Sequence, residues 1–491
     1  MSEICSIIGC NYEVFEKGKC IFHCKKDDWY DEDNNGKKDW SNSKGKIQKF
    51  WELFIHELKK DEELHEFADI KFPISFIYDS FSEFKLELQS EMINDGKSLK
   101  LYNCTFLDKV EIESTNFFNS LSFSECKFKN NFIIDGDVEN LDFCNCNFDK
   151  ELKLVSLENA NLYIEGGNFK DRIYSWLCSF KELRVKARNI TDFKFFKCKM
   201  YSKMVFKEVY VDRLSFKKCK FDDDLYCEFH DVNISSLDID SVDNISDAVV
   251  FFDVTIHRQF LLKNTNLSNY EFHNCDVSEC DKIKIKNVAF QGNNGFTIFN
   301  DVKWPSCKKF SYLNDKDKNK DKTKDETKKE DKDKKKSLTL RDTFRQLKYV
   351  NEKQGNIIEA NKFYSAEMNA YKEEIKGEKW KTHWQDKIIF WLNEKVSNFS
   401  QNWLRPLGWF FLLGFIAFVF SNVNRITTYL NNTSKLTPAT FLNAINEFFV
   451  YLNPFNTSSG KWNPVIWLVF KALSIFIIYQ FIISLRRQTR R

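Results

Sequence analysis

The chain has 491 residues, too many for a single hydrophobic core of ordinary size, so we expect several domains. It carries 74 lysines and arginines against 71 aspartates and glutamates, and this near balance argues against a protein that binds nucleic acid through its overall charge. Phenylalanine is abundant, at 50 residues, whereas 15 glycines and 6 prolines are too few for a collagen-like or linker-rich protein.

A cluster of cysteine and histidine opens the chain in the pattern C-x4-C-x9-C-x2-H. The candidate ligands are Cys5, Cys10, Cys20 and His23, with Cys24 as an alternative to His23. Zinc prefers four nitrogen or sulfur ligands, and a segment this short folds when metal binding supplies the free energy. The alternative is a cysteine-rich disordered tail. We predict a structural Zn²⁺ site in a knuckle-like domain over residues 1–26.

Residues 27–98 form the second predicted domain, a helical cap. Within it, KIQKFWELFIHELKK places an apolar stripe on one face of a helix, made of Ile47, Phe50, Trp51, Phe54, Ile55 and Leu58. A repeat array needs a terminal element that covers its first repeat, and this helix immediately precedes one.

From residue 99 to 312 the chain repeats a small residue two positions before a large one. The pairs are Cys104/Phe106, Cys126/Phe128, Cys146/Phe148, Ala160/Leu162, Gly167/Phe169, Cys198/Met200, Cys219/Phe221, Val232/Ile234, Thr265/Leu267 and Cys275/Val277. The strong pairs recur about every 20 to 22 residues, the period of one coil of a β-solenoid. We read most of the 15 cysteines as reduced and structural. The alternative fold is an irregular β-sandwich.

The units CTFLD, CNFDK, ANLYI, GNFKD, VNISS and TNLSN resemble degenerate repeats of the pentapeptide-repeat proteins. This resemblance implies a right-handed, four-sided β-solenoid over 99–312. The fold class is therefore multidomain, with a degenerate pentapeptide-repeat-like solenoid followed by an α-helical two-transmembrane pore module.

Alternating lysine and aspartate make residues 313–337 a predicted disordered linker, since the segment can bury nothing. A nucleic-acid-binding arm is the alternative, which the interleaved acidic residues disfavour. The helical period returns over 338–400, where Leu340, Phe344 and Leu347 mark one stripe and Gly355 a turn. We predict a helical hairpin there, followed by an amphipathic helix, WQDKIIFWLNEKVSNF, along the membrane interface.

The module 401–491 contains two stretches long and apolar enough to cross a bilayer, Trp403 to Val423 and Pro464 to Leu485. Lysines and arginines crowd before the first stretch and in RRQTRR after the second, whereas the connecting loop carries few. The positive-inside rule places both chain ends in the cytoplasm. We therefore predict a multi-pass protein of the inner (plasma) membrane, with a cytoplasmic solenoid.

The connection between these stretches predicts a re-entrant half-helix. The segment from Thr437 to about Tyr451 begins with TPAT, an N-cap followed by proline in the first turn, and is too short to cross. Irregular backbone at membrane depth is tolerated where it lines a water-filled cavity, so we expect LNPFNTSS to face an aqueous pathway. This order of elements is typical of a pore subunit.

Lys471 is an ionisable residue inside the second stretch, which makes it a functional candidate. It lines the lumen, with Glu447 as a candidate partner, or it snorkels outward. The predicted pore-lining or selectivity residues are Asn443, Glu447, Asn453, Lys471, Ser474, Ile478 and Ile482, with Arg486 and Arg487 at the inner mouth. TVGYG is absent, so a potassium-type carbonyl filter is not predicted.

TFRQLK, EANKFYSAEM, the two apolar stretches and YQFIISLRRQTRR together resemble the ion-channel-like module at the end of bacterial pentapeptide-repeat membrane proteins. The resemblance implies a homo-oligomer, a tetramer with the pore on its axis. By analogy it also suggests an effector that depolarises the membrane under stress or phage attack.

We expect a gated ion channel whose cytoplasmic solenoid senses a ligand or a partner protein. The gating ligand is unidentified, and a nucleotide or oligonucleotide on the lysine-rich solenoid faces is one candidate. The alternative is a membrane-anchored solenoid scaffold that binds a protein or a nucleic acid. We do not expect an enzyme, since no nucleophile with a base, phosphate-binding glycine loop or paired carboxylates stand out.

Overall fold

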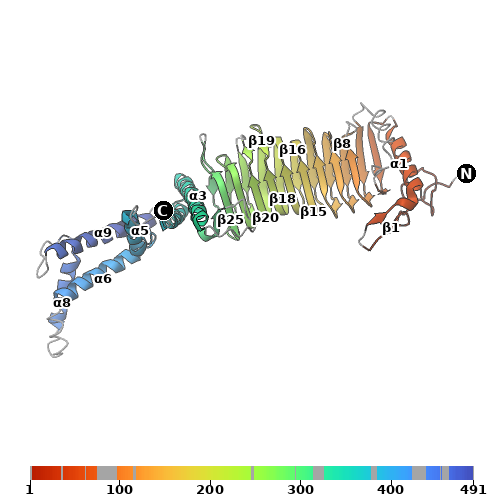
Figure 1. Cartoon of the computed structure of the whole chain (residues 1–491). Helices are drawn as coiled ribbons and strands as arrows, with labels where there is room; N and C mark the ends of the chain where they lie inside the picture. Colours follow the sequence, from red (N-terminus) through yellow and green to blue (C-terminus); the bar gives the residue numbers. More distant parts are fainter. Residues whose placement is uncertain are drawn as a thin grey trace. The chain divides into compact units, whose positions relative to one another are not determined.

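The computed structural model describes residues 3–34, 37–60, 62–74, 97–113, 118–244, 248–292, 295–312, 326–376, 384–422, 438–453, 455 and 464–489. The chain divides into two compact units, Met1–Lys318 and Asn319–Arg491, and each is described here by itself. In Figure 1 the strands of the first unit run from red to green, and the helices of the second from teal to blue.

The first unit is dominated by a β-solenoid, which has about 8 turns over residues 98–289. Its strands are β3 (Leu64–Ala68), β4 (Lys71–Phe72), β5 (Lys97–Tyr102), β6 (Thr105–Phe106), β7 (Val110–Glu113), β8 (Phe118–Ser124), β9 (Lys127–Phe128), β10 (Phe132–Asp135), β11 (Asn140–Cys144), β12 (Asn147–Phe148), β13 (Leu152–Val155), β14 (Ala160–Glu165), β15 (Asn168–Trp176), β16 (Ser179–Lys186), β17 (Asn189–Phe196), β18 (Lys199–Lys217), β19 (Lys220–Phe221), β20 (Tyr226–Asp240), β21 (Asp243–Asn244), β22 (Val249–Phe252), β23 (Thr255–Asn266), β24 (Tyr270–His273), β25 (Lys282–Ala289), β26 (Ile298–Asn300) and β27 (Phe310–Tyr312). The pairings between successive coils are parallel, as between β5 and β8 or β11 and β14, which excludes the β-sandwich.

Stacked side chains fill the axis of the solenoid. Phe106, Phe128, Phe148 and Phe169 occupy the same position in successive coils, and their ring centroids lie 4.6, 4.1 and 4.9 Å apart. Each ring is almost completely buried. Stacked aromatic pairs contribute roughly 0.5–1.5 kcal/mol beyond the area they bury, which accounts for the abundance of phenylalanine.

The small residue of each predicted pair lies just after a corner of the coil. The corner residue has a positive φ, as in Asn103 at 49° and Asn145 at 53°, before Cys104 and Cys146. The buried thiol then donates a hydrogen bond to a carbonyl of the preceding coil: the Cys146 Sγ lies 3.2 Å from the Phe123 oxygen. Cysteine is therefore used here as a small buried side chain whose thiol bonds a main-chain carbonyl of the preceding coil.

The helix α1 (Lys44–Leu58) covers the first coil, as predicted for a cap. Its buried Phe50 and Phe54 meet the ring of Phe72 on β4 edge to face, with centroids 5.7 and 5.2 Å apart. Since β3 and β4 pair with β5 and β6, the parallel ladder starts within the segment that was assigned to the cap. The short strands β1 (Asp31–Glu32) and β2 (Lys38–Asp39) and the 3-10 turns Ser41–Ser43 and Cys307–Lys309 complete this unit.

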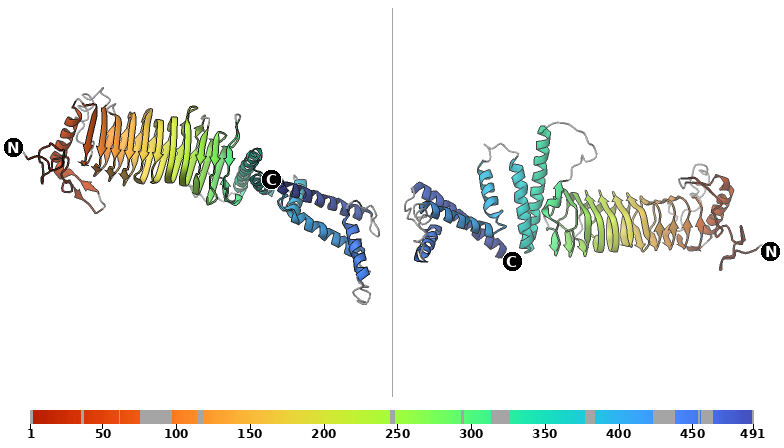
Figure 2. Two further views of the ribbon diagram at one scale, coloured as in Figure 1. Left: turned by 180° about the vertical axis from the view of Figure 1, so that it is seen from behind. Right: turned by 90° about the horizontal axis from the view of Figure 1, so that it is seen from below.

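The second unit is helical (Figure 2). Its helices are α3 (Glu326–Lys353), α4 (Ile357–Lys376), α5 (Trp384–Ser397), α6 (Leu404–Ser421), α8 (Pro438–Leu452) and α9 (Pro464–Thr489). The predicted hairpin is present as α3 and α4, joined at Gly355, whose φ of 78° favours glycine. Phe344, Leu347 and Val350 are buried, as their spacing predicted.

The predicted disordered linker needs a correction over 326–337, because α3 begins at Glu326. Lysine and glutamate have high helix propensity and pair favourably four residues apart, so a charged tract can extend a helix that is anchored at one end. The remainder of the linker, 313–325, lies outside the described residues.

Candidate functional site

The four predicted metal ligands converge in the first unit. One ligand atom from each of Cys5, Cys10, Cys20 and His23 lies within 4.8 Å of all the others. The Cys20 Sγ is 3.2 Å from the His23 Nδ1 and 3.6 Å from the Cys10 Sγ, and the Cys5 Sγ is 3.6 Å from the same Nδ1. This Cys3His cluster could bind a metal such as zinc.

The orientation of His23 decides between the two candidate fourth ligands. Its Nε2 lies 3.1 Å from the carbonyl oxygen of Ala68, to which it donates, and this leaves the lone pair of Nδ1 facing the three thiols. Cys24 turns away and donates to the Ile21 carbonyl at 3.4 Å, so His23 completes the cluster.

The knuckle is fixed to the solenoid cap by apolar and cationic contacts. The ring of Phe22 lies 5.4 Å from that of Phe50 on α1. The ammonium of the fully buried Lys26 lies 4.9 Å from the centre of the same Phe50 ring and also donates to the carbonyls of Ile21 and Phe22 within the knuckle, at 3.0 and 3.1 Å. Loss of the knuckle would therefore expose the end of the solenoid.

The thiols of the cluster differ in pKa. Burial would raise the pKa of Cys5, but hydrogen bonds from the Cys20 and Ile7 backbones lower it. Burial raises the pKa of Cys20 to about 12. Cys5 is therefore the thiol of the cluster that ionises most readily.

Two helices of the second unit, Leu404–Ser421 and Pro464–Arg487, are long and apolar enough to span a membrane. They agree within two residues with the predicted stretches. Both display large apolar side chains on their outer faces, among them Phe415 at 56%, Phe420 at 69% and Leu468 at 70% exposure. Such dense apolar exposure indicates a surface that a bilayer or another chain covers.

The helix α8 occupies the predicted half-helix and packs by its C-terminal end between α6 and α9. At Gly414 of α6, an added Cβ would lie 2.3 Å from the Cδ2 of Leu452, so any larger residue would force the Leu452 side chain to shift. The Tyr451 ring meets Trp467 of α9 edge to face at 6.1 Å. Ala417 and Phe470 complete the small core beneath.

Lys471 lies under the C-terminal end of α8 and is only 7% exposed. Its Nζ donates to the carbonyl of Asn453 at 2.5 Å and to that of Tyr451 at 3.4 Å. It also lies 4.3 Å from the centre of the Trp467 ring. Main-chain carbonyls thus take the place predicted for Glu447, and the positive charge meets the negative end of a helix dipole.

The other predicted pore residues fall into two groups. Ser474 is buried and donates to the Phe470 carbonyl of its own helix at 3.0 Å. Asn443, Asn453 and Ile482 are exposed, and Glu447 and Ile478 are half-buried. Pore lining by these residues stays a prediction.

A polar junction at the C-terminal end of α9 was not predicted. Gln480 accepts a hydrogen bond from the Ser397 hydroxyl at 3.0 Å and donates to the Asn393 side chain at 2.9 Å. Arg487 donates to the Phe399 carbonyl at 3.1 Å and stacks on Tyr364 of α4. Arg486, the other residue assigned to the inner mouth, is exposed.

Comparisons of this chain with protein-family models, curated proteins and solved structures found no match.

Proposed function

We propose that this protein is a gated, homo-oligomeric ion channel, in which α6 and α9 cross the inner membrane and α8 is a re-entrant pore helix. The observation that carries the proposal is the contact of Lys471 with the carbonyls that end α8. Lys471 lies about 10 Å along the helix axis from Pro464, at 1.5 Å per residue. The end of α8 is therefore at membrane depth.

A helix that ends inside a bilayer leaves its last carbonyls without backbone partners, and this is costly in hydrocarbon. The Lys471 ammonium satisfies two of them here. Such a buried cation is also costly unless it is partnered, so a membrane anchor alone would not require either group. The contact between Lys471 and these carbonyls is explained if the polar segment that follows α8 lines an aqueous pathway.

The proposed oligomer follows from the small number of helices in one chain. Two spans and one half-helix cannot enclose a lumen, so several copies must surround it, and we favour a tetramer. The exposed apolar faces of α6 and α9 supply both the lipid contact and the contact between copies. Asn443, Glu447 and Ile482 of the several copies would then lie around the axis.

In this proposal the first unit is the cytoplasmic sensor. A structural Zn²⁺ held by Cys5, Cys10, Cys20 and His23 stabilises the knuckle that packs on its cap helix. The hairpin α3–α4 transmits the signal, because its Tyr364 and Asn361 contact Arg487 at the end of the second span. A role as a membrane-depolarising effector in stress or phage defence is part of the same proposal.

A flux assay in proteoliposomes tests the proposal. Purified full-length protein should dissipate a salt-diffusion potential, read by a potential-sensitive dye, and a Glu447→Ala/Asn453→Ala variant should change that rate. Potentials that persist with both the full chain and a chain starting at residue 337 would favour the scaffold instead.

A further inference from the structure

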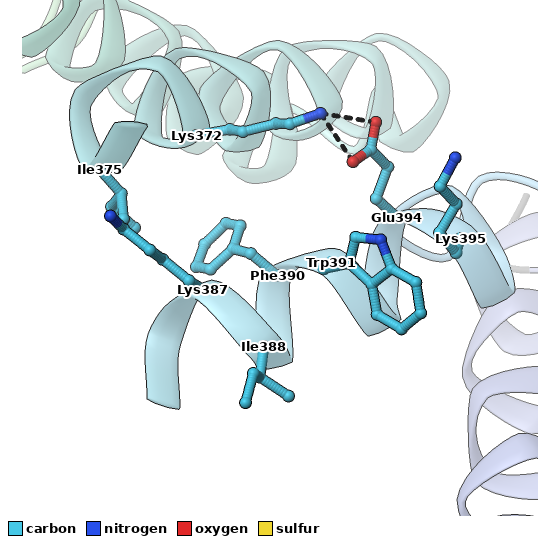
Figure 3. A pocket seen from close by; sticks show the side chains of 8 residues that line it. All are labelled: Lys372, Ile375, Lys387, Ile388, Phe390, Trp391, Glu394 and Lys395. Atoms are coloured by element: carbon cyan, nitrogen blue, oxygen red, sulfur yellow. Dashed lines mark hydrogen bonds and ion pairs between the residues drawn. The ribbon is translucent and has the colours of Figure 1, made fainter. Parts of the chain in front are cut away.

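A cavity of about 620 Å³ lies between α4 and α5 in the second unit (Figure 3). Its walls include Ile375, Phe390 and Trp391, and Lys372, Lys387 and Lys395 stand around it. The proposed channel mechanism uses none of these side chains.

The lysines give the cavity an excess of positive charge. Lys372 is held by both carboxylate oxygens of Glu394, each 2.7 Å from its Nζ. Glu394 is the one acidic residue in the described lining, and it stands against three lysines. An anion is therefore favoured at the rim.

The walls of the cavity are apolar, and part of them is exposed to solvent. Ile388 and Trp391 are 40% and 57% exposed on α5, although both are large apolar side chains. Phe390 packs its ring edge to face on Tyr371 of α4 at 4.8 Å, which fixes the inner wall. A wholly polar ligand such as free phosphate would gain nothing from these walls, whereas an acyl chain would.

The cavity also lies close to the start of the first membrane-length helix. The indole of Trp409, in the second turn of α6, donates to the Lys395 carbonyl at 3.2 Å. Tryptophan and lysine together are typical of the headgroup level of a bilayer. The cavity is thus placed where a phospholipid headgroup lies, if α6 crosses the membrane as proposed.

We propose that this cavity binds one anionic phospholipid, with its phosphate against Lys395 and an acyl chain along Trp391, Phe390 and Ile388 toward Lys387. The inference rests on the membrane placement in the proposed function, but it does not require ion conduction. Because Glu394 joins α5 to Lys372 of the hairpin, a bound lipid would brace the same helices that lead to the first span.

Native mass spectrometry of the full-length protein tests the site, with equimolar phosphatidylglycerol and phosphatidylcholine supplied in detergent. We expect wild type to retain phosphatidylglycerol at least ten-fold over phosphatidylcholine, and Lys387→Gln/Lys395→Gln to lose that preference. The matched control is Lys353→Gln/Lys362→Gln, which removes the same charge outside the cavity and should bind like wild type. A photoreactive phosphatidylglycerol should label residues 384–397 of the unmodified protein.

The outcomes separate the site from the membrane placement. Equal preference in the cavity variant and in wild type, or labelling elsewhere, would overturn the lipid site while leaving the spans intact. Retention of neither lipid would contradict both the lipid site and the membrane placement. Displacement of phosphatidylglycerol by millimolar inorganic phosphate would show that the lysines bind phosphate alone, and would overturn the assignment to lipid.

Discussion

The ammonium of Lys471 on α9 donates to the carbonyl of Asn453 at the end of α8, at 2.5 Å. One residue inside an apolar helix thus holds the terminus of a second helix. The same end is fixed on its other side by the contact of Leu452 with Gly414 on α6. The position of α8 therefore depends on the charge of Lys471 and on the absence of a side chain at Gly414.

Replacing Lys471 with methionine keeps the apolar stem and removes the cation. The carbonyls of Tyr451 and Asn453 then lose their donor, which costs about 1–3 kcal/mol for buried groups. We expect amide hydrogen exchange over 438–452 to accelerate about ten-fold in detergent-purified protein, since 1.4 kcal/mol is a factor of ten. Lys362→Met, on the exposed side of α4, should leave that exchange unchanged; equal acceleration in both variants would argue against the clamp.

Gly414→Ala should loosen the packing of α6 on α8, because the new Cβ lies too close to the Leu452 side chain. Overpacking of this kind costs about 1–3 kcal/mol. Leu452→Ala relieves the clash, so the double variant should be more stable than the sum of the single effects predicts. A double-mutant cycle on thermal unfolding in detergent measures this coupling, and strict additivity would contradict the contact.

Metal analysis should find one zinc per chain. Cys20→Ser removes a ligand and should abolish the metal, whereas Cys24→Ser should retain it, because Cys24 donates to Ile21 outside the cluster. Protons compete with the metal for thiolates and imidazole, so zinc should be released as the pH falls from 7 to 5. Full zinc content in Cys20→Ser, or its loss in Cys24→Ser, would show that the ligand set is wrong.

The buried thiols of the solenoid make its stability depend on pH. Burial raises the pKa of Cys275 to about 11 and that of Cys280 to about 12, from an ordinary 9.0. Their contribution is fully present below pH 9, where both states are protonated, and is lost as the pH rises through the folded values. The shift at Cys275 alone corresponds to about 3 kcal/mol.

The urea midpoint of the solenoid, followed by circular dichroism, should therefore fall between pH 9 and pH 12. Cys275→Ala/Cys280→Ala should fall less steeply over this interval, while Cys307→Ala, which changes a half-exposed thiol, should follow wild type. Identical slopes in all three proteins would exclude these thiols as the cause.

The coils could be predicted because every turn of a solenoid buries the same two positions, so pairs such as Cys126/Phe128 and Cys146/Phe148 recur after about 20 to 22 residues. The corner residue was harder to recognise. Asparagine at 103 and 145 signals a positive φ, but Glu125 and Lys197 adopt the same conformation without any such signal. Tertiary pairing with the coils on either side imposes it on them.

The candidate site was predicted in part for similar reasons. Three cysteines in a short polar segment indicate a metal, but the choice of His23 over Cys24 depends on the distant Ala68 carbonyl. The partner of Lys471 could not be found from sequence, because main-chain carbonyls carry no residue signature. Gly414 could not be singled out from the sequence either. It lies within an apolar run, and its role depends on the packing of Leu452 of α8 against it.

Single-channel recording tests the central claim most directly. Full-length protein in a planar bilayer under asymmetric salt should give discrete current steps. Lys471→Ala should shift the reversal potential of these currents toward the equilibrium potential of the cation. Bilayers that contain verified, inserted protein but stay silent, with both the full chain and the chain from residue 337 onward, would contradict a channel.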